Sequence, residues 1–459
     1  IGISAVTQYY TMAVEQARQL KRDTGAAIIV GGGHITCLPE SLDPIFDVGV
    51  IGEGEETMHE LFELHRAGKW GPEHFKEVRG ICYHGQDGKV LRTGTRPPIR
   101  PLDKVPPPDR ELLGDRWTLP FSQFISIVSS RGCPFDCMFC SSQKHFEGPT
   151  RYFSAEYVLK EIEEVLDRWS PAAITFWDDL FIAQPTRLSE LSHLIAERGI
   201  NKRVAFTCST RANIVNEKKC EDLRRMNVVS VNFGAESGSD HVLRYLKGGN
   251  VSVEQNQKAI DLFNRYGINV ACSFICGSPA ERPEDAQATL DFVRRNRDKL
   301  IGAEFFPVVA YPGTQMWTEA VAAGKIPMPV EDWGRFSLSV SGNGAEFWDK
   351  YIYLNEQMPV EVFKGYFYQL QEESLQLALR KTTKRIRDLE KALDYHLQLV
   401  EESRSFRRRR GVRAVEKVLG LKDRVLASVR GIRKAPAQVA ESVEKRPHKV
   451  TMGSAFNCG

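Results

Sequence analysis

Six short apolar segments alternate with helical segments through the middle of the chain, and this alternation restricts the fold more than any other feature. The apolar segments lie at 124–130, 172–179, 203–209, 228–236, 269–277 and 302–309. The stretches with helical periodicity lie at 154–169, 185–197, 216–226, 253–266 and 283–296. Strands alternating with helices predict a parallel sheet covered by helices. Right-handed crossovers would curl it into a (β/α)6 partial TIM barrel, and a flat doubly wound sheet is the alternative.

The chain of 459 residues is long enough for several domains. Its first segment also alternates strands and helices, then forms a hairpin with Asp87 and Gly88 at the turn, and a proline-rich stretch follows. We therefore expect an α/β fold throughout most of the chain. The expected regions are an α/β domain at 1–95, a linker at 96–122, the barrel at 123–318, a helical region at 319–403 and a basic tail at 404–459.

Three cysteines, Cys133, Cys137 and Cys140, follow the first apolar segment in the spacing CxxxCxxC. The ten cysteines of the chain are too dilute for a disulfide framework, so a tight group of thiols favours metal binding or catalysis. A zinc site normally needs four ligands, and His145 is the nearby candidate for the fourth. Three thiolates on a cubane 4Fe–4S cluster would leave one iron open for a substrate or cofactor. The spacing favours the cluster.

This motif, with the aromatic Phe139 before its last cysteine, resembles the radical S-adenosylmethionine (SAM) superfamily. The resemblance covers residues 1 to about 320. It implies that the three cysteines hold a 4Fe–4S cluster whose open iron binds SAM, and that reductive cleavage of SAM gives methionine and a 5′-deoxyadenosyl radical. The segments WDD at 177–179 and FGAESGS at 233–239 resemble the subgroup of this family that also carries a cobalamin domain.

The resemblance also implies residues that contact SAM, in the cysteine loop and at the ends of expected strands. Phe139 would lie near the adenine, and Arg211 would hold the carboxylate with its guanidinium fork. Glu236, followed by Ser237, would accept hydrogen bonds from the ammonium or the ribose hydroxyls. Gly277 belongs to the segment GSPAE, which resembles a G-x-P-G-E turn with alanine in place of the second glycine.

The first domain resembles a Rossmann-like cobalamin-binding domain through Ser4, Gly31, Gly32 and Gly33, because a serine can hydrogen-bond the cofactor and glycines allow the backbone to approach a ring closely. The segment IGEGEET at 51–57 adds to this resemblance. The D-x-H-x-x-G motif, whose histidine ligates cobalt in many relatives, would precede residue 1. We therefore expect a truncated cobalamin-type domain, and His34 is not assigned as a cobalt ligand.

The resemblance implies an enzyme that takes hydrogen from an unactivated carbon and methylates it with the help of cobalamin. The alternatives are a radical SAM enzyme that catalyses cyclisation, rearrangement or oxidation without methyl transfer, and a non-catalytic iron–sulfur redox protein. The expected partners are a small-molecule or lipid substrate and an electron donor such as flavodoxin or ferredoxin. Nucleic acid is not expected, because no RNA-binding module accompanies the arginines at 407–410.

The net charge of +3 combines a mildly acidic body with a basic segment, since 404–434 contains twelve Lys or Arg against Glu416 and Asp423. An amphipathic pattern at 411–432 suggests contact with an anionic membrane surface, and a solvated helix is the alternative. The chain has no apolar run that could cross a bilayer and no signal-peptide pattern. We expect a cytoplasmic protein that contacts the inner membrane face at most peripherally.

Overall fold

The structure, a computed structural model, describes residues 1–112, 124–337 and 344–406. It divides into two compact units. Among the described residues, the first unit comprises 1–112, 124–337 and 351–374, and the second comprises 344–350 and 375–406. All the candidate site residues discussed below lie in the first unit.

The first unit contains a six-stranded sheet in which all neighbouring strands are parallel. The strands are β6 (Phe124–Ile127), β9 (Ala173–Phe176), β10 (Ala205–Thr210), β11 (Val228–Glu236), β12 (Asn269–Cys276) and β13 (Leu300–Pro307). They lie side by side in the order in which they occur in the chain, and β6 and β13 form the two open edges. A doubly wound sheet would reverse its strand order at a switch point. The partial barrel is therefore confirmed, and the flat alternative is wrong.

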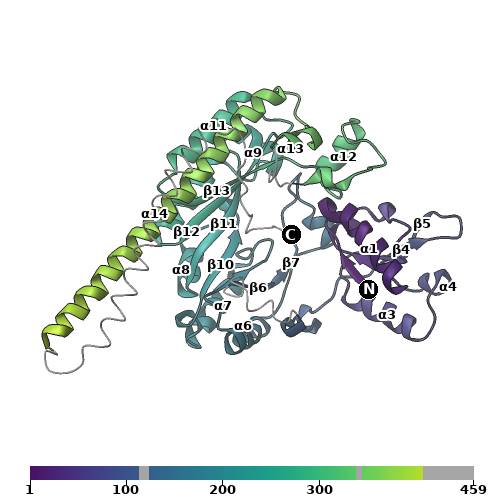
Figure 1. Cartoon of the computed structure of the whole chain (residues 1–459), viewed down its shortest axis with the longest axis horizontal. Coiled ribbons are helices and arrows are strands. Elements are labelled where there is room, and N and C mark those ends of the chain that lie inside the picture. The colour runs from purple at the N-terminus through teal and green to yellow at the C-terminus, as the bar shows by residue number, and fades with distance from the viewer. Residues whose placement is uncertain (113–123, 338–343, 407–459) are drawn as a thin grey trace. The chain divides into compact units, whose positions relative to one another are not determined.

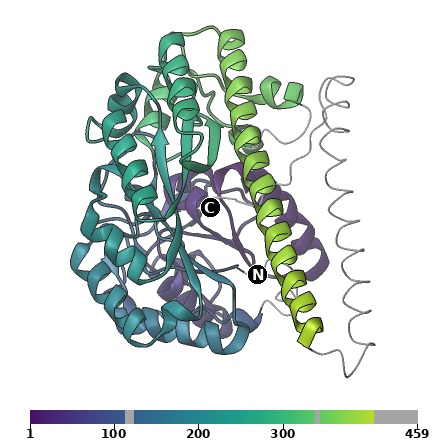
Figure 2. The same ribbon diagram turned by 90° about the vertical axis from the view of Figure 1, so that its left-hand side faces the viewer.

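The helices that connect these strands lie along the outer side of the sheet (Figures 1 and 2). They are α6 (Ala155–Trp169), α7 (Pro185–Glu197), α8 (Glu217–Arg225), α9 (Asp240–Lys247), α10 (Val253–Arg265) and α11 (Pro283–Arg295). Several begin at a polar cap; Ser154, for example, accepts a hydrogen bond from the Tyr157 amide. These caps satisfy backbone donors that a helix start would otherwise leave unpaired.

Burial alternates along the strands, which separates an outer from an inner face. Phe274 of β12 is fully buried and packs against Phe292 of α11, with ring centroids 6.3 Å apart. The half-buried residues between the buried ones, such as Ser273 and Glu304, therefore line the inner face. Full β/α barrels fill this space with branched apolar side chains, whereas here these two inward positions carry polar side chains.

The N-terminal part of the first unit has a five-stranded sheet in the order β1-β2-β3-β4-β5. Its strands are β1 (Gly2–Ser4), β2 (Ile29–Gly31), β3 (Val48–Val50), β4 (Ile81–His84) and β5 (Val90–Arg92). Strands β1, β2 and β3 are parallel to one another, β4 is antiparallel to β3, and β5 is antiparallel to β4. The helices are α1 (Tyr10–Thr24), α2 (Gly33–Cys37), α3 (Glu55–Arg66) and α4 (Pro72–Phe75). Its apolar core is continuous with Val308, Trp317 and Trp333 from later in the same unit.

The C-terminal region is helical, as the sequence predicts. It contains α12 (Gln315–Ala322), the 3-10 helix η8 (Trp333–Phe336), α13 (Gly344–Lys350) and α14 (Val360–Phe406). Phe363 and Phe367 are buried, so these aromatic residues belong to the core. The basic segment at 407–434 lies outside the described residues. Across the part of the chain that the structure describes, every helix lacks the combination of length and apolar character needed to cross a membrane.

Candidate active site

The cysteines lie in a loop that a small hairpin closes at its base. Strands β7 (Ser130–Arg131) and β8 (Arg151–Tyr152) pair antiparallel, so the two ends of the loop are adjacent. Along the loop Cys133 is half-buried, Cys137 is buried and Cys140 is exposed. The Gln143 amide donates a hydrogen bond to the Cys133 carbonyl at 2.6 Å. The loop is therefore held at its base as well as by its own side chains.

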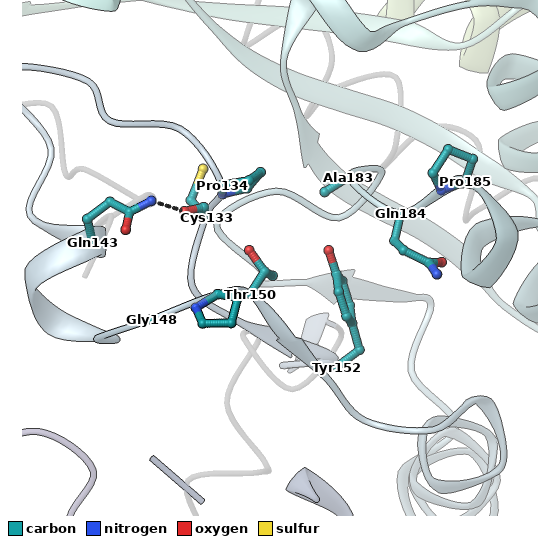
Figure 3. A pocket seen from close by; sticks show the side chains of 10 residues that line it. Cys133, Pro134, Gln143, Gly148, Thr150, Tyr152, Ala183, Gln184 and Pro185 are labelled. Carbon is teal, nitrogen blue, oxygen red and sulfur yellow. Dashed lines mark hydrogen bonds between the residues drawn. The ribbon is translucent and has the colours of Figure 1, made fainter. Parts of the chain in front are cut away.

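A solvent-open pocket of about 550 Å³ lies beside Cys133. Its lining comes from the cysteine loop, from β8 and from the residues at the start of α7. The lining residues are Cys133, Pro134, Gln143, Gly148, Pro149, Thr150, Tyr152, Ala183, Gln184 and Pro185. The hydroxyl groups of Thr150 and Tyr152 point toward the space between Pro134 and Ala183 (Figure 3). The pocket gives solvent and small molecules access to the cysteine loop.

Arg211, just after β10, reaches the cysteine loop. Its Nη1 lies 3.0 Å from the sulfur of Cys137, and its guanidinium carbon lies 4.0 Å from the centre of the Phe135 ring. Its Nε donates to Asn213 at 3.1 Å. Among the described residues, its buried Nη2 has no hydrogen-bond partner. A buried guanidinium donor without an acceptor is costly, so the site suits a ligand that brings an acceptor oxygen to this point.

The two aspartates of the WDD segment hold the cysteine loop from the neighbouring strand. Asp178 is buried and accepts hydrogen bonds from the backbone amides of Ser129 and Ser130 and from the Ser129 hydroxyl, each at 2.6 Å. Burial raises the pKa of Asp178. The carboxylate of Asp179 accepts from the Ser142 hydroxyl at 2.5 Å, two residues after the last cysteine. Asp178 thus fixes the start of the loop, and Asp179 fixes its far side.

Glu236 ends β11 with a positive φ of 61° and is already ion-paired. Its Oε1 lies 3.1 Å from the Nζ of Lys247 in α9, and both side chains are less than 10% exposed. Lys247 also donates to the Gly234 carbonyl at 2.5 Å. Sequence reasoning missed Lys247. The sequence does contain a signal for it. Lys247 directly follows Leu246 in a helix whose apolar positions, Val242, Leu243 and Leu246, face the core. A lysine beside that face is expected to be buried and therefore to need an ionic partner.

Ser237 and Gly277, also predicted to contact the cofactor, are engaged within the protein. The Ser237 hydroxyl is fully buried and lies 3.1 Å from the Thr289 hydroxyl. A side chain at Gly277, whose φ is +78°, would come within 2.8 Å of the Phe363 ring. The Gly277 amide donates to the carboxyl group of Glu281. In this structure both residues shape turns at the strand ends.

Glu281 is a buried carboxyl group that should make stability depend on pH. Burial raises its pKa from 4.5 to about 8. A raised pKa means that the folded state keeps the proton while the unfolded state loses it. The resulting contribution to the free energy of unfolding is fully present below pH 4.5 and is lost as pH rises toward 8. We expect Glu281→Gln, which resembles the neutral acid, to be more stable than the native protein above pH 8 by about 2 to 4 kcal/mol.

This expectation can be measured by urea unfolding at pH 4.5 and pH 8.5. The substituted and native proteins should differ little at the lower pH and diverge at the higher one. Equal slopes of stability against pH for the two proteins would show that Glu281 does not titrate in this range.

The residues predicted for cobalamin come together in the N-terminal part. Ser4 pairs in register with Gly31 at the ends of β1 and β2. Gly32 has a φ of +97°, and a side chain there would lie 2.7 Å from the Ala5 carbonyl, so only glycine fits. Gly33 faces open space. At Gly33 the turn therefore leaves room for a flat ring to approach.

His34, next to these glycines, is enclosed. Its ring lies 4.0 Å from the ring centre of Tyr10, its Nδ1 is 3.2 Å from the Thr7 hydroxyl, and its Nε2 is 2.8 Å from the Ser41 hydroxyl. Burial lowers its pKa to about 3. Both ring nitrogens are engaged, which agrees with leaving His34 out of the cobalt ligands.

Within residues 1–112, 124–337 and 344–406, no three His, Cys, Asp or Glu side chains converge on one ion. The thiolates of a cubane cluster each bind a different iron and need not converge in this way. Cys208, Cys272 and Cys276 are buried in the strands and belong to the core packing.

Comparisons with known proteins agree with this geometry. The family described as "Radical SAM superfamily" matches residues 127–293, and "Radical SAM proteins, N-terminal" matches residues 3–78. Over 327 residues the chain is 32% identical to a Pyrococcus horikoshii protein named uncharacterized methyltransferase PH0819, covering 70% of this chain and 69% of that one. It is 29% identical over 303 residues to the anaerobic magnesium-protoporphyrin IX monomethyl ester cyclase of Rubrivivax gelatinosus, covering 64% of this chain. The chain spans 54% of the length of that cyclase.

Among solved structures, the fold resembles the radical S-adenosylmethionine methyltransferase TsrM from Kitasatospora setae with cobalamin and a 4Fe–4S cluster bound. The TM-score is 0.62 at 16% sequence identity, and the match covers 81% of this chain and 79% of TsrM. At this identity the match shows a common fold.

An open parallel β/α barrel with three cysteines in the loop after its first strand defines the class of iron–sulfur enzymes that generate radicals. The chain belongs to the radical SAM superfamily. It is therefore an enzyme that uses a 4Fe–4S cluster and SAM, and the reading as a non-catalytic redox protein is not supported.

Proposed function

We propose that the protein is a cobalamin-dependent radical SAM methylase that acts on an unactivated carbon of a small molecule. The observation that carries the proposal is the presence, in one compact unit, of the cysteine loop and an α/β domain with a glycine-only turn at the ends of β1 and β2. The names of relatives support it, since PH0819 is named a methyltransferase and TsrM is a methyltransferase with cobalamin bound.

In this proposal Cys133, Cys137 and Cys140 hold the cluster, and Phe139 lies beside the adenine of SAM. Arg211 binds the SAM carboxylate. Its unpartnered Nη2 supports this role, because a carboxylate would supply the missing acceptor. The contact of its Nη1 with the Cys137 sulfur would place this positive charge next to a cluster ligand. Ser4, Gly31, Gly32 and Gly33 would contact cobalamin.

When bound, the cluster supplies the electron that cleaves SAM to a 5′-deoxyadenosyl radical, and methylcobalamin supplies a methyl group. The protein would bind and orient these groups. Asp178 and Asp179 keep the cysteine loop in one conformation through their hydrogen bonds to Ser129 and Ser142. Glu236, which is paired with Lys247, would accept a hydrogen bond from the ammonium or ribose of SAM. We expect the electron to come from a flavodoxin or ferredoxin.

A second candidate is a radical SAM enzyme that closes a ring without transferring a methyl group. It is favoured by the match to the magnesium-protoporphyrin IX monomethyl ester cyclase. The two candidates share the radical-generating site, so the same residues would serve both. They differ in their products, because only methyl transfer consumes a second SAM and forms S-adenosylhomocysteine.

The test uses protein reconstituted anaerobically with iron and sulfide and supplied with cobalamin, SAM and dithionite. We expect 5′-deoxyadenosine and S-adenosylhomocysteine, quantified by mass spectrometry, to form in the native protein and not in Cys140→Ala. Formation of 5′-deoxyadenosine alone would favour the ring-closing candidate. If neither product forms while the cluster is intact, the proposed function is wrong.

A further inference from the structure

A buried group of charges joins the N-terminal domain to the base of the cysteine loop. Glu53, in the loop between β3 and α3, has a side chain that is 9% exposed. Its Oε1 lies 2.8 Å from Nη1 of Arg131 and 2.8 Å from Nη2 of Arg151, and its Oε2 lies 2.9 Å from Nη1 of Arg151. The carboxylate is thus shared by two guanidinium groups, and their hydrogen bonds help to keep its pKa low against the opposing effect of burial.

The same group also holds the linker. The Ile99 amide donates to Oε2 of Glu53 at 2.8 Å, and Arg151 donates to the Ile99 carbonyl at 3.0 Å. Arg131 has a second partner, because its Nη2 lies 2.5 Å from the carboxylate of Glu55. Glu53 is therefore the point at which the N-terminal domain, the linker and the cysteine loop meet.

The two arginines mark the ends of the loop that bears all three cysteines. Arg131 comes two residues before Cys133, and it pairs directly with Arg151 across β7 and β8. Like charges on directly opposed residues repel each other. Without the Glu53 carboxylate between them, the buried guanidinium of Arg151 and the partly buried guanidinium of Arg131 would repel each other at the base of the loop.

We propose that Glu53 is a positioning residue that holds the base of the cysteine loop closed, so that the N-terminal domain sets the geometry in which the cluster is bound. Removing one partner of a buried ion-paired group leaves uncompensated charge, and this is far more disruptive than losing an exposed pair. The proposal rests on the proposed role of the three cysteines as cluster ligands. It adds that a residue of the other domain controls that loop.

The experiment compares Glu53→Gln with the native full-length protein by hydrogen–deuterium exchange, before and after cluster reconstitution. Glutamine keeps the shape of the side chain and removes its charge. We expect amide exchange in residues 131–151 of the cluster-free protein to become at least about tenfold faster. The control is Glu60→Gln. Glu60 is an exposed residue of α3 whose carboxylate lies 2.6 Å from Nη2 of Arg96, and it does not contact the cysteine loop. It should leave exchange in 131–151 unchanged.

The reconstituted proteins allow a second measurement, on the cluster itself, which a residue with a purely structural role would leave unchanged. We expect Glu53→Gln to change the electron paramagnetic resonance spectrum of the reduced cluster, with and without SAM, and Glu53→Asp to restore it in part. Native exchange rates in 131–151, or equal acceleration throughout the chain, would overturn the proposal. The exchange result on cluster-free protein does not depend on SAM cleavage, so failure of the proposed function is distinguishable from failure of this inference.

Discussion

Cys137→Ala should lower 5′-deoxyadenosine formation by more than about 100-fold and prevent stable cluster binding. The physical reason is that a cubane with three protein thiolates has no spare ligand to lose. Even substitution of a residue that only hydrogen-bonds to a metal ligand typically lowers metal affinity by 10 to 100-fold. The substitution also removes the sulfur that Nη1 of Arg211 contacts at 3.0 Å. The measurement is iron and sulfide per chain, together with the product formed under anaerobic conditions.

The control for this prediction is Cys220→Ala. Cys220 is a fully buried cysteine in α8, and its loss changes only packing. It should retain the cluster and the activity. A Cys137→Ala protein that keeps a full complement of iron and cleaves SAM at the native rate would show that Cys137 is not a ligand.

Lys247→Met should lower the free energy of unfolding by about 3 to 5 kcal/mol, because it leaves Glu236 buried without its ionic partner. The two side chains are 4% and 9% exposed, and their charged atoms lie 3.1 Å apart. The measurement is urea unfolding near neutral pH. Replacing both partners, as Lys247→Met with Glu236→Gln, should recover much of the loss, since no unpaired charge then remains.

The matched control is Lys299→Met, which breaks the exposed pair with Asp261 at 2.5 Å. Exposed ion pairs contribute roughly 0 to 1 kcal/mol, so this change should have a small effect. Similar losses in the two lysine variants would mean that the buried pair contributes no more than a surface pair. The ion pair at the end of β11 would then not explain the stability of that strand end.

The sequence by itself determined the fold class and the position of the cysteine loop. Alternating strands and helices require a parallel sheet, since each crossover helix returns the chain to the same edge. The spacing of Cys133, Cys137 and Cys140 lies within one loop, so it is visible without knowing the fold. The strand-end positions of Arg211 and Glu236 followed from the same alternation, because the ends of parallel strands meet at one edge.

Only the tertiary structure decided which partner each charged residue meets. Arg211 and Cys137 are 74 residues apart, and Glu53 and Arg151 are 98 apart, yet each pair lies within hydrogen-bond distance. Local spacing carries no information about such contacts, because they depend on how strands and domains pack. Burial has the same origin: Ser237 and Gly277 carry the expected motif, but Thr289 and Phe363, from distant segments, fill the space around them. A motif therefore predicts the chemistry of a site, and packing decides which side chains remain free to perform it.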